Sequence, residues 1–215
     1  MMNTNEVLKA LKWRYATKVF DKARKIPTDV WNVLEQSLLL SPSSYGLQPW
    51  KFVVVQNAEL RQKLRAVSWN QPQVTDSSHF VVLLFRETID EAYISEFIAR
   101  TAEVRGMKVE QLEGYRRSMM GDLVEGPRAK VIESWAQRQS YIAMGFLMQT
   151  AALLEVDTCA LEGFDPQAYD QLLKLSGSGY KSIVAVALGY RSADDKSQSN
   201  LKVRFSKEKV IEWFP

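Results

Sequence analysis

Four cationic side chains near the two ends of the chain have types and spacings suited to binding an anion. Arg14 and Lys18 lie four residues apart in the stretch RYATKVF, and Lys202 and Arg204 lie two residues apart near the C-terminus. Guanidinium and ammonium groups bind phosphate, and arginine also makes planar bidentate contacts with it. The first pair could instead belong to a solvated basic turn or a targeting signal, and the second could be ordinary surface charge. Their function therefore depends on what the rest of the chain brings beside them.

Residues that drive cofactor-free catalysis are scarce. His79 is the one histidine and Cys159 the one cysteine in the sequence. We expect His79 to be a polar residue at a strand edge and Cys159 to be inert packing in an apolar strand. The glycines of LSGSGYKS (175–182) precede a predicted strand instead of following one, so they do not fit a phosphate loop. We therefore expect no metal site, and any chemistry would belong to a bound organic cofactor.

The composition is that of an ordinary soluble protein. A chain of 215 residues can build one sizeable core, and 46% hydrophobic with 25% charged residues is typical of globular domains. The net charge of +3 is too mild to indicate nucleic-acid binding. No apolar run approaches the roughly 20 residues that cross a bilayer, and no secretory signal is evident. We expect a cytoplasmic protein with no membrane or nucleic-acid partner.

The hydrophobic pattern predicts an α+β sandwich in which helices flank a mixed central sheet. Runs of β-branched and apolar residues predict buried strands, and apolar residues at helical spacing predict the helices. The strands are expected at residues 51–56, 79–85, 158–162 and 182–190. The helices are expected from the N-terminus to Trp13, from Pro27 to Ser41, after Asn57, from Val131 to Leu154 and from Gln167 to Leu175. Thr28, Asn57 and Asp165 are the expected N-caps of three of them.

Two regions suggest features beyond a simple sandwich. Residues 90–126 are punctuated by four glycines and are predicted to form a helical lid inserted in one domain spanning 1–215. The segment Tyr141–Leu154 is apolar nearly all round, and the tail carries Trp213 and Phe214. A homodimer in which helices and a C-terminal arm bury surface would explain both features. The alternative is a deep core helix and a tail folded back on its own chain.

Four segments of the chain carry a resemblance to a known family. They are RYATK (14–18), SPSSYGLQPW (41–50), LEGFD (161–165) and KVR (202–204). In this order they resemble the motifs R-x-x-T-K-x-F, SPSS-x-x-x-QPW, EGFD and K-x-R of the FMN-dependent nitroreductase family, including the oxygen-insensitive NAD(P)H nitroreductases and the dihydropteridine reductases. The resemblance covers nearly the whole chain except 90–126. It implies a three-layer sandwich and a homodimer with exchange of the C-terminal arms.

The resemblance also implies roles at the two ends of a flavin mononucleotide. Arg14, Lys202 and Arg204 would hold the phosphate. Lys18 is the residue expected to tune the flavin, because a cation near N1 and O2 stabilises the negative charge of the reduced ring. The side-chain amide of Asn70 would assist Lys18.

Further contacts are implied for the backbone and for the second subunit. The N–H groups of Glu162 and Gly163 would face N5 and O4 of the ring, the glycine permitting close approach. Pro42, Ser43 and Ser44 would reach the flavin of the partner, so that the site is complete only in the dimer. The full set of expected cofactor-binding residues is Arg14, Tyr15, Ala16, Thr17, Lys18, Pro42, Ser43, Ser44, Asn70, Gln73, Glu162, Gly163, Lys202, Val203 and Arg204.

The chain departs from the family pattern at three places. Tyr15 and Ala16 replace a histidine and a serine, and Tyr45 and Gly46 follow SPSS where an asparagine-containing pair is common. Gln73 stands where a lysine is frequent, which removes a cation from the ring and would lower its reduction potential.

The activity that the resemblance implies is a two-step, ping-pong oxidoreduction. NAD(P)H would reduce FMN at N5, and a nitroaromatic, a quinone or a similar electron-poor acceptor would then take the electrons. Alternatives are a dehalogenating or flavin-fragmenting enzyme of the same fold, a non-catalytic flavin carrier or sensor, and a small basic binding module without a cofactor.

Overall fold

The computed structural model describes residues 3–214. It contains four strands and a larger number of helices, as the sequence predicts. The main elements in chain order are α1 (Thr4–Trp13), α2 (Thr28–Leu39), β1 (Trp50–Val55), α3 (Ala58–Ala66), α4 (Gln73–Asp76), β2 (His79–Arg86), α5 (Glu91–Arg105), α6 (Glu113–Met119), α7 (Ile132–Leu153), β3 (Asp157–Leu161), α8 (Pro166–Leu172), β4 (Tyr180–Gly189) and α9 (Lys207–Val210). Short 3-10 and π turns lie at 44–46, 109–112, 120–124, 127–131 and 196–199.

The four strands form one sheet in the order β1-β2-β4-β3. All three pairings are antiparallel, with Val53 opposite Val82 and Val81 opposite Val186. The expectation of a mixed sheet is therefore wrong for the described strands. Helices cover both faces of the sheet, so its central strands are apolar on both sides, and the alternating pattern that indicates an antiparallel sheet is absent.

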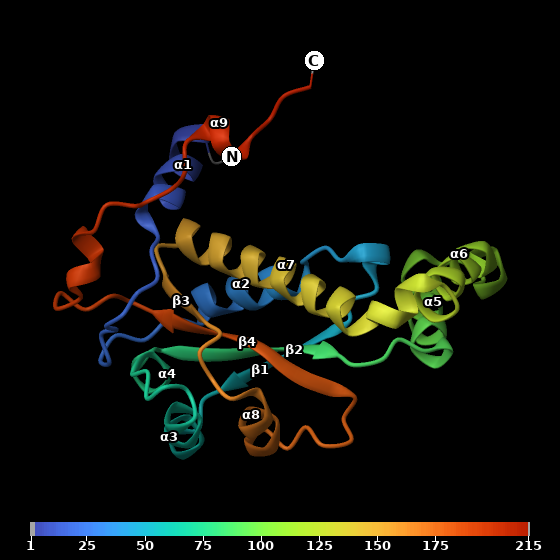
Figure 1. Cartoon of the computed structure of the whole chain (residues 1–215), viewed down its shortest axis with the longest axis horizontal. Helices are drawn as coiled ribbons and strands as arrows, with labels where there is room; N and C mark the ends of the chain where they lie inside the picture. The colour runs from blue at the N-terminus through green and yellow to red at the C-terminus, as the bar shows by residue number, and fades with distance from the viewer. Residues whose placement is uncertain (1–2, 215) are drawn as a thin grey trace.

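Helices lie on both faces of the sheet, which gives three layers (Figure 1). On one face α2 and α7 pack against the sheet through a core that contains Leu34 and Leu147, neither of them exposed. On the other face α3 and α8 pack through a second core around Leu64 and Tyr169. The predicted α+β sandwich is confirmed, and its two apolar layers hold the sheet edges and loops that carry the predicted site.

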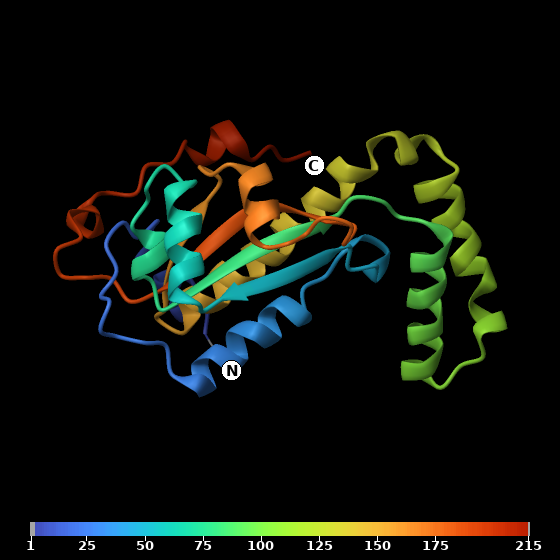
Figure 2. The same cartoon turned by 90° about the horizontal axis from the view of Figure 1, so that it is seen from below.

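The region 90–126 forms α5, α6 and the turns that follow them. Figure 2 shows this part projecting beyond the end of the sheet. It has its own apolar cluster, in which Ile94, Ile98 and Met119 pack against Trp135 at the start of α7. Asp90 caps α5 by accepting a hydrogen bond from Tyr93 N at 2.8 Å.

The local signals for helix starts are mostly confirmed. Asn57 Oδ1 accepts from Leu60 N at 2.8 Å, and Asp165 Oδ1 accepts from Gln167 N at 3.0 Å with Pro166 in the first turn. Thr28 was expected to cap α2. In the structure the cap position is Pro27, Thr28 is the first helical residue, and no side-chain cap bond forms there.

Apolar surface remains exposed on α7 and along the tail. On α7, Ile142 is 40% exposed and Phe146 is 45% exposed. In the tail, Trp213 is 78% exposed and Phe214 is 85% exposed, so the tail is not folded back into the core of its own chain. Among residues 3–214, no helix combines the length and apolar composition that crossing a membrane requires.

The core on the α7 face predicts a stability effect. Replacing the fully buried Leu147 with alanine removes three carbons and leaves a cavity, so we expect the free energy of unfolding to fall by about 2–5 kcal/mol. Urea denaturation monitored by circular dichroism measures this. The matched change Leu8→Ala, at a 48% exposed position on α1, should cost less than about 1 kcal/mol. Equal costs at the two positions would contradict the packing described.

Candidate functional site

A buried carboxylate holds the first predicted site segment in place. Asp195, only 1% exposed, accepts from Lys18 N at 2.7 Å, from Val19 N at 3.1 Å and from the Tyr15 hydroxyl at 2.9 Å. Its other oxygen accepts from Ser197 N at 2.9 Å. Burial alone would raise the pKa of Asp195, but these hydrogen bonds outweigh it and hold the pKa below the ordinary value. One charged group thus ties the beginning of the chain to the start of its tail.

The same segment also runs beside the edge strand β3. Thr17 N donates to the Thr158 carbonyl at 3.2 Å, and Ala16 forms an isolated parallel bridge with Thr158. The buried Asp157 accepts from the Thr17 hydroxyl at 3.3 Å and forms an ion pair with Arg191 at 2.6 Å. The backbone from residue 14 to 18 is therefore positioned along its length, which leaves the side chains of Arg14 and Lys18 to serve the site.

The cations predicted from opposite ends of the chain come together. Lys202 Nζ donates to the Arg14 carbonyl. Burial lowers the pKa of Arg14, and the nearby Arg204 lowers it further. Burial also lowers the pKa of Lys202, with Arg14, Arg204 and Arg191 adding to the effect. Arg14 Nε is buried and has no hydrogen-bond partner.

This arrangement favours an anion. Like charges gathered in one place repel, and a buried donor without a partner is costly. In the part of the chain that the structure describes, Arg14, Lys202 and Arg204 form no ion pair with a carboxylate. A phosphate beside them would relieve the repulsion and satisfy the unpaired guanidinium.

A second group of predicted residues surrounds the Cys159 thiol. Burial raises the pKa of this thiol, while Lys18, a hydrogen bond with Gln73 and the charge of Arg14 act in the opposite direction. Lys18 and Gln73 therefore lie within interaction range of one buried atom. Cys159 is itself 2% exposed and remains packing, as the sequence analysis expected.

The turn after β3 contains Glu162 and Gly163, and two neighbours hold it. The Tyr141 hydroxyl on α7 donates to the Glu162 carboxylate, and Gln71 Nε2 donates to the Gly163 carbonyl at 3.0 Å. A Cβ at position 163 would lie 2.6 Å from the Trp69 ring, so only glycine fits there without movement of Trp69. The sequence analysis gave the Glu162 carboxylate no role, whereas here it anchors the turn to α7.

Asn70 lies in a tight turn next to Trp69, both with positive φ, at 55° and 52°. Asn70 Oδ1 accepts from Arg65 Nε at 2.9 Å. Trp69 is 82% exposed and covers Gly163. The turn therefore places an open aromatic surface beside the glycine.

The segment Pro42, Ser43 and Ser44 lies elsewhere in the same chain. Ser44 N donates to Gln139 Oε1 in the first half of α7, whereas Trp13, next to Arg14, shares a groove with Ala152 at the end of α7. Positions 139 and 152 are 13 residues apart, which corresponds to about 20 Å of helix. Within one chain, Ser44 and Trp13 therefore lie near different ends of α7. Val203, between Lys202 and Arg204, is 85% exposed in the tail.

Sequence reasoning missed several residues that build the site. Asp195, Arg191, Asp157 and Tyr141 were assigned no role in the site. Their partners in the site are backbone or side-chain groups 21–180 positions away, so no local sequence pattern predicts these contacts.

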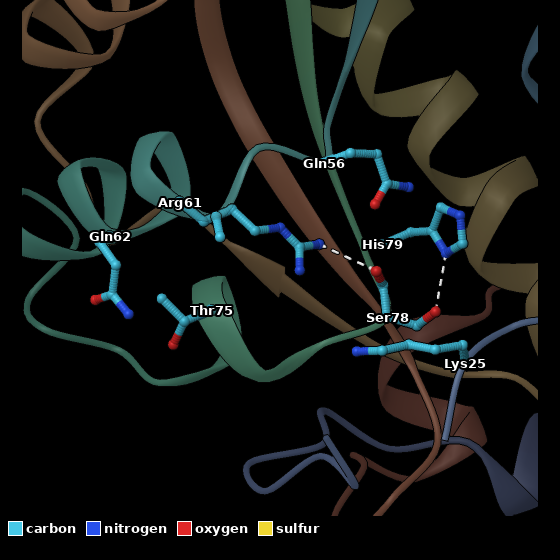
Figure 3. Close-up of a pocket in the computed structure, with 8 residues that line it drawn as sticks. Lys25, Gln56, Arg61, Gln62, Thr75, Ser78 and His79 are labelled. Carbon is cyan, nitrogen blue, oxygen red and sulfur yellow. Dashed lines mark hydrogen bonds between the residues drawn. The ribbon is translucent and has the colours of Figure 1, made fainter. Parts of the chain in front are cut away.

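A separate cavity of about 550 Å³ opens near the start of β2 (Figure 3). Its most buried charged residue, Arg61, donates to the Val55 carbonyl at 2.9 Å, to the Ser77 carbonyl at 2.7 Å and to the Ser78 carbonyl at 3.4 Å. Burial lowers the pKa of Arg61 to about 10. This guanidinium satisfies backbone carbonyls where β1 ends and β2 begins, which is a structural role.

His79 beside this cavity behaves as a structural residue. Its ring stacks on Trp31 with centroids 4.0 Å apart. The Ser78 hydroxyl accepts from Ile26 N at 2.9 Å and forms a second hydrogen bond, of 3.0 Å, with His79 Nδ1. Burial, with the charges of Arg61 and Lys25, lowers the pKa of His79 to about 4, so the ring is neutral at pH 7.

Comparison with known proteins agrees with the motifs. The model of the Nitroreductase family matches residues 11–190. A provisionally named NAD(P)H nitroreductase of Staphylococcus saprophyticus is 36% identical over 96% of each chain, and YfkO of Bacillus subtilis, similarly named, is 37% identical over 97% of each. A provisionally named nitroreductase of Exiguobacterium sibiricum, solved in complex with FMN, has a TM-score of 0.80 at 20% identity and covers 100% of this chain and 98% of its own.

The chain belongs to the nitroreductase family. The family model covers most of the chain, and relatives above 30% identity match it almost end to end. The resemblance drawn from four short motifs is thereby confirmed, and the solved structure shows the same fold.

The anchoring carboxylate predicts a pH effect. In the folded protein the pKa of Asp195 is lowered from 3.8, so its stabilising contribution is present above that value and is lost as the pH falls through the lower folded-state pKa. Replacing it with asparagine removes charged acceptors, and we expect a loss of about 2–4 kcal/mol at pH 7. The difference between wild type and Asp195→Asn should shrink as the pH is lowered below 4. Urea unfolding at several pH values measures it, and a constant difference would contradict the assignment.

Proposed function

We propose that the protein is an FMN-dependent oxidoreductase that takes electrons from NAD(P)H and passes them to an electron-poor acceptor. The observation that carries the proposal is the convergence of Arg14, Lys202 and Arg204, with a buried, unpaired guanidinium nitrogen. The names of the relatives and the FMN-bound fold neighbour support it.

The phosphate end of FMN suits the three cations. A phosphate dianion accepts bidentate hydrogen bonds from guanidinium groups and single bonds from ammonium groups. It would supply the acceptor that Arg14 Nε lacks and screen the charges that lower the pKa of Lys202. These residues fit the cofactor for reasons that do not depend on the family.

The ring end would be bounded by Lys18, Gln73 and the Glu162–Gly163 turn. When bound, FMN supplies the redox chemistry, accepting a hydride from the nicotinamide and returning electrons to the second substrate. Lys18 contributes a fixed positive charge that favours the reduced state. The turn contributes backbone N–H groups held by the bonds from Tyr141 and Gln71.

The second subunit would complete the site. Within one chain, Ser44 is bonded to Gln139, whereas Trp13, the neighbour of Arg14, shares a groove with Ala152, about 20 Å further along α7. Exposed Ile142 and Phe146 on α7, together with the apolar tail, provide surface for a homodimer to bury. The insert of α5 and α6 would then border the acceptor side as a lid.

Cofactor binding gives the first test. The purified protein should be yellow and should oxidise NADH or NADPH when a quinone or nitroaromatic is added. Arg204→Ala should weaken FMN binding about 10- to 100-fold, because it removes a charged hydrogen-bond donor. Lys18→Ala should lower the flavin midpoint potential while retaining FMN. The control Lys63→Ala, on the surface of α3, should change neither property.

The outcomes separate the alternatives. A colourless protein would rule out the flavin enzyme. A yellow protein without NAD(P)H oxidation by any acceptor would indicate a carrier or sensor. Halide release, or stoichiometric oxygen use with loss of the flavin, would indicate the dehalogenating or flavin-fragmenting type.

Subunit complementation gives a second test. If each site takes Arg14 from one subunit and Ser44 from its partner, Arg14→Ala and Ser44→Trp alter the site from different subunits. In a co-refolded equal mixture, half of the dimers are mixed and each has one intact site, so activity should recover to about a quarter of wild type. If all contacts came from one chain, the mixture would show only the residual activities of the two variants.

A further inference from the structure

Gln73 is a buried residue with an unused acceptor. It is 4% exposed, and its Oε1 has no hydrogen-bond partner. Leaving a buried carbonyl oxygen unpaired is costly, so such an atom in a native fold indicates a missing partner. Gln73 is the first residue of α4 and follows Pro72, which restricts the backbone on its N-terminal side.

The position of Gln73 belongs to the ring end of the site. Its side chain and the Lys18 charge both act on the buried Cys159 thiol. Two positions before it, Gln71 bonds to the Gly163 carbonyl at 3.0 Å, which joins the loop of Gln73 to the Glu162–Gly163 turn. The unpaired acceptor therefore lies among the groups expected to surround the flavin ring.

Asn70 offers the other side-chain carbonyl of this loop expected to face the flavin, and that carbonyl already accepts one hydrogen bond. Asn70 Oδ1 accepts from Arg65 Nε at 2.9 Å, and the Asn70 backbone carbonyl accepts from the same nitrogen at 3.3 Å. Of the two amide side chains, Gln73 is the one whose oxygen is buried and accepts no bond within the described residues.

The pyrimidine edge of an oxidised flavin presents two carbonyl oxygens, O2 and O4, with the N3–H donor between them. The Lys18 ammonium and the N–H groups of the Glu162–Gly163 turn can serve the two oxygens, but as donors they cannot serve N3–H. We propose that Gln73 Oε1 accepts the hydrogen bond from N3–H and is the residue that positions the pyrimidine edge. This inference rests on the proposed function.

The inference explains why an amide is useful at this position. An ammonium group only donates hydrogen bonds, and N3–H is also a donor, so a lysine at this position could not bond to N3–H and would repel it. The amide supplies the acceptor and adds no charge, so Lys18 acts on the ring without a second cation at position 73.

The test compares FMN with 3-methyl-FMN, in which a methyl group replaces the N3 hydrogen. Flavin is removed from the full-length protein, and the dissociation constants of the two flavins are measured by fluorescence quenching. Wild type should prefer FMN by roughly tenfold or more. Gln73→Ala removes the acceptor and makes room for the methyl group, so the preference should fall to about twofold or less. Asn70→Ala tests the other amide of the loop. It should keep the wild-type preference for FMN even though both flavins bind more weakly, because Asn70 is itself expected to contact the ring.

A conservative variant guards against a purely structural effect. Gln73→Glu keeps an acceptor at the same length, so the preference for FMN should persist, and the added negative charge should lower the midpoint potential. The inference would be overturned if methylation of N3 weakened flavin binding equally in wild type and in Gln73→Ala. It would also be overturned if Asn70→Ala or Gln73→Glu lost the preference for FMN over 3-methyl-FMN. Equal binding of both flavins by wild type would overturn this inference alone, whereas binding of neither would overturn the proposed function with it.

Discussion

The structure of the site depends on one buried carboxylate. Asp195 lies where the chain leaves the sheet for its tail, and it binds two backbone N–H groups and the Tyr15 hydroxyl of a segment 180 residues earlier. A buried carboxylate without hydrogen-bond partners is strongly unfavourable. Separating residues 15–19 from the tail would therefore either expose Asp195 or leave its charge buried and unpaired. This constraint allows Arg14, Lys202 and Arg204 to remain together although their charges repel one another.

Much of the fold could be predicted from the sequence, because β-branched runs and caps act locally. The four strands and the caps at Asn57 and Asp165 were found this way. Strand direction was not, because helices on both faces of the sheet make its central strands apolar on both sides and remove the alternation that separates antiparallel from parallel sheets. The expected Thr28 cap failed because Pro27 already supplies a backbone suited to starting a helix.

The candidate site also contains residues that could be predicted from the sequence and residues that could not. The convergence of the cations could be predicted because their residue types suit a phosphate and because their order matched a family. The positioning groups could not, because Asp195, Asp157 and Tyr141 act on partners brought close only by the fold. A carboxylate in a polar stretch has the same local pattern whether it lies in solvent or binds four donors.

The two ends of the site differ in their electrostatics, and this difference suits a cofactor that must be held tightly and also change charge. At one end several cations gather with an unpaired guanidinium, which provides affinity for a permanently charged phosphate. At the proposed ring end, Lys18 and the neutral Gln73 both act on the Cys159 thiol, so a flavin ring there would experience the field of fewer charges. The proposed function thereby assigns binding strength and redox tuning to different residues, so substitutions at the ring end would change the potential while the phosphate cluster still retained the cofactor.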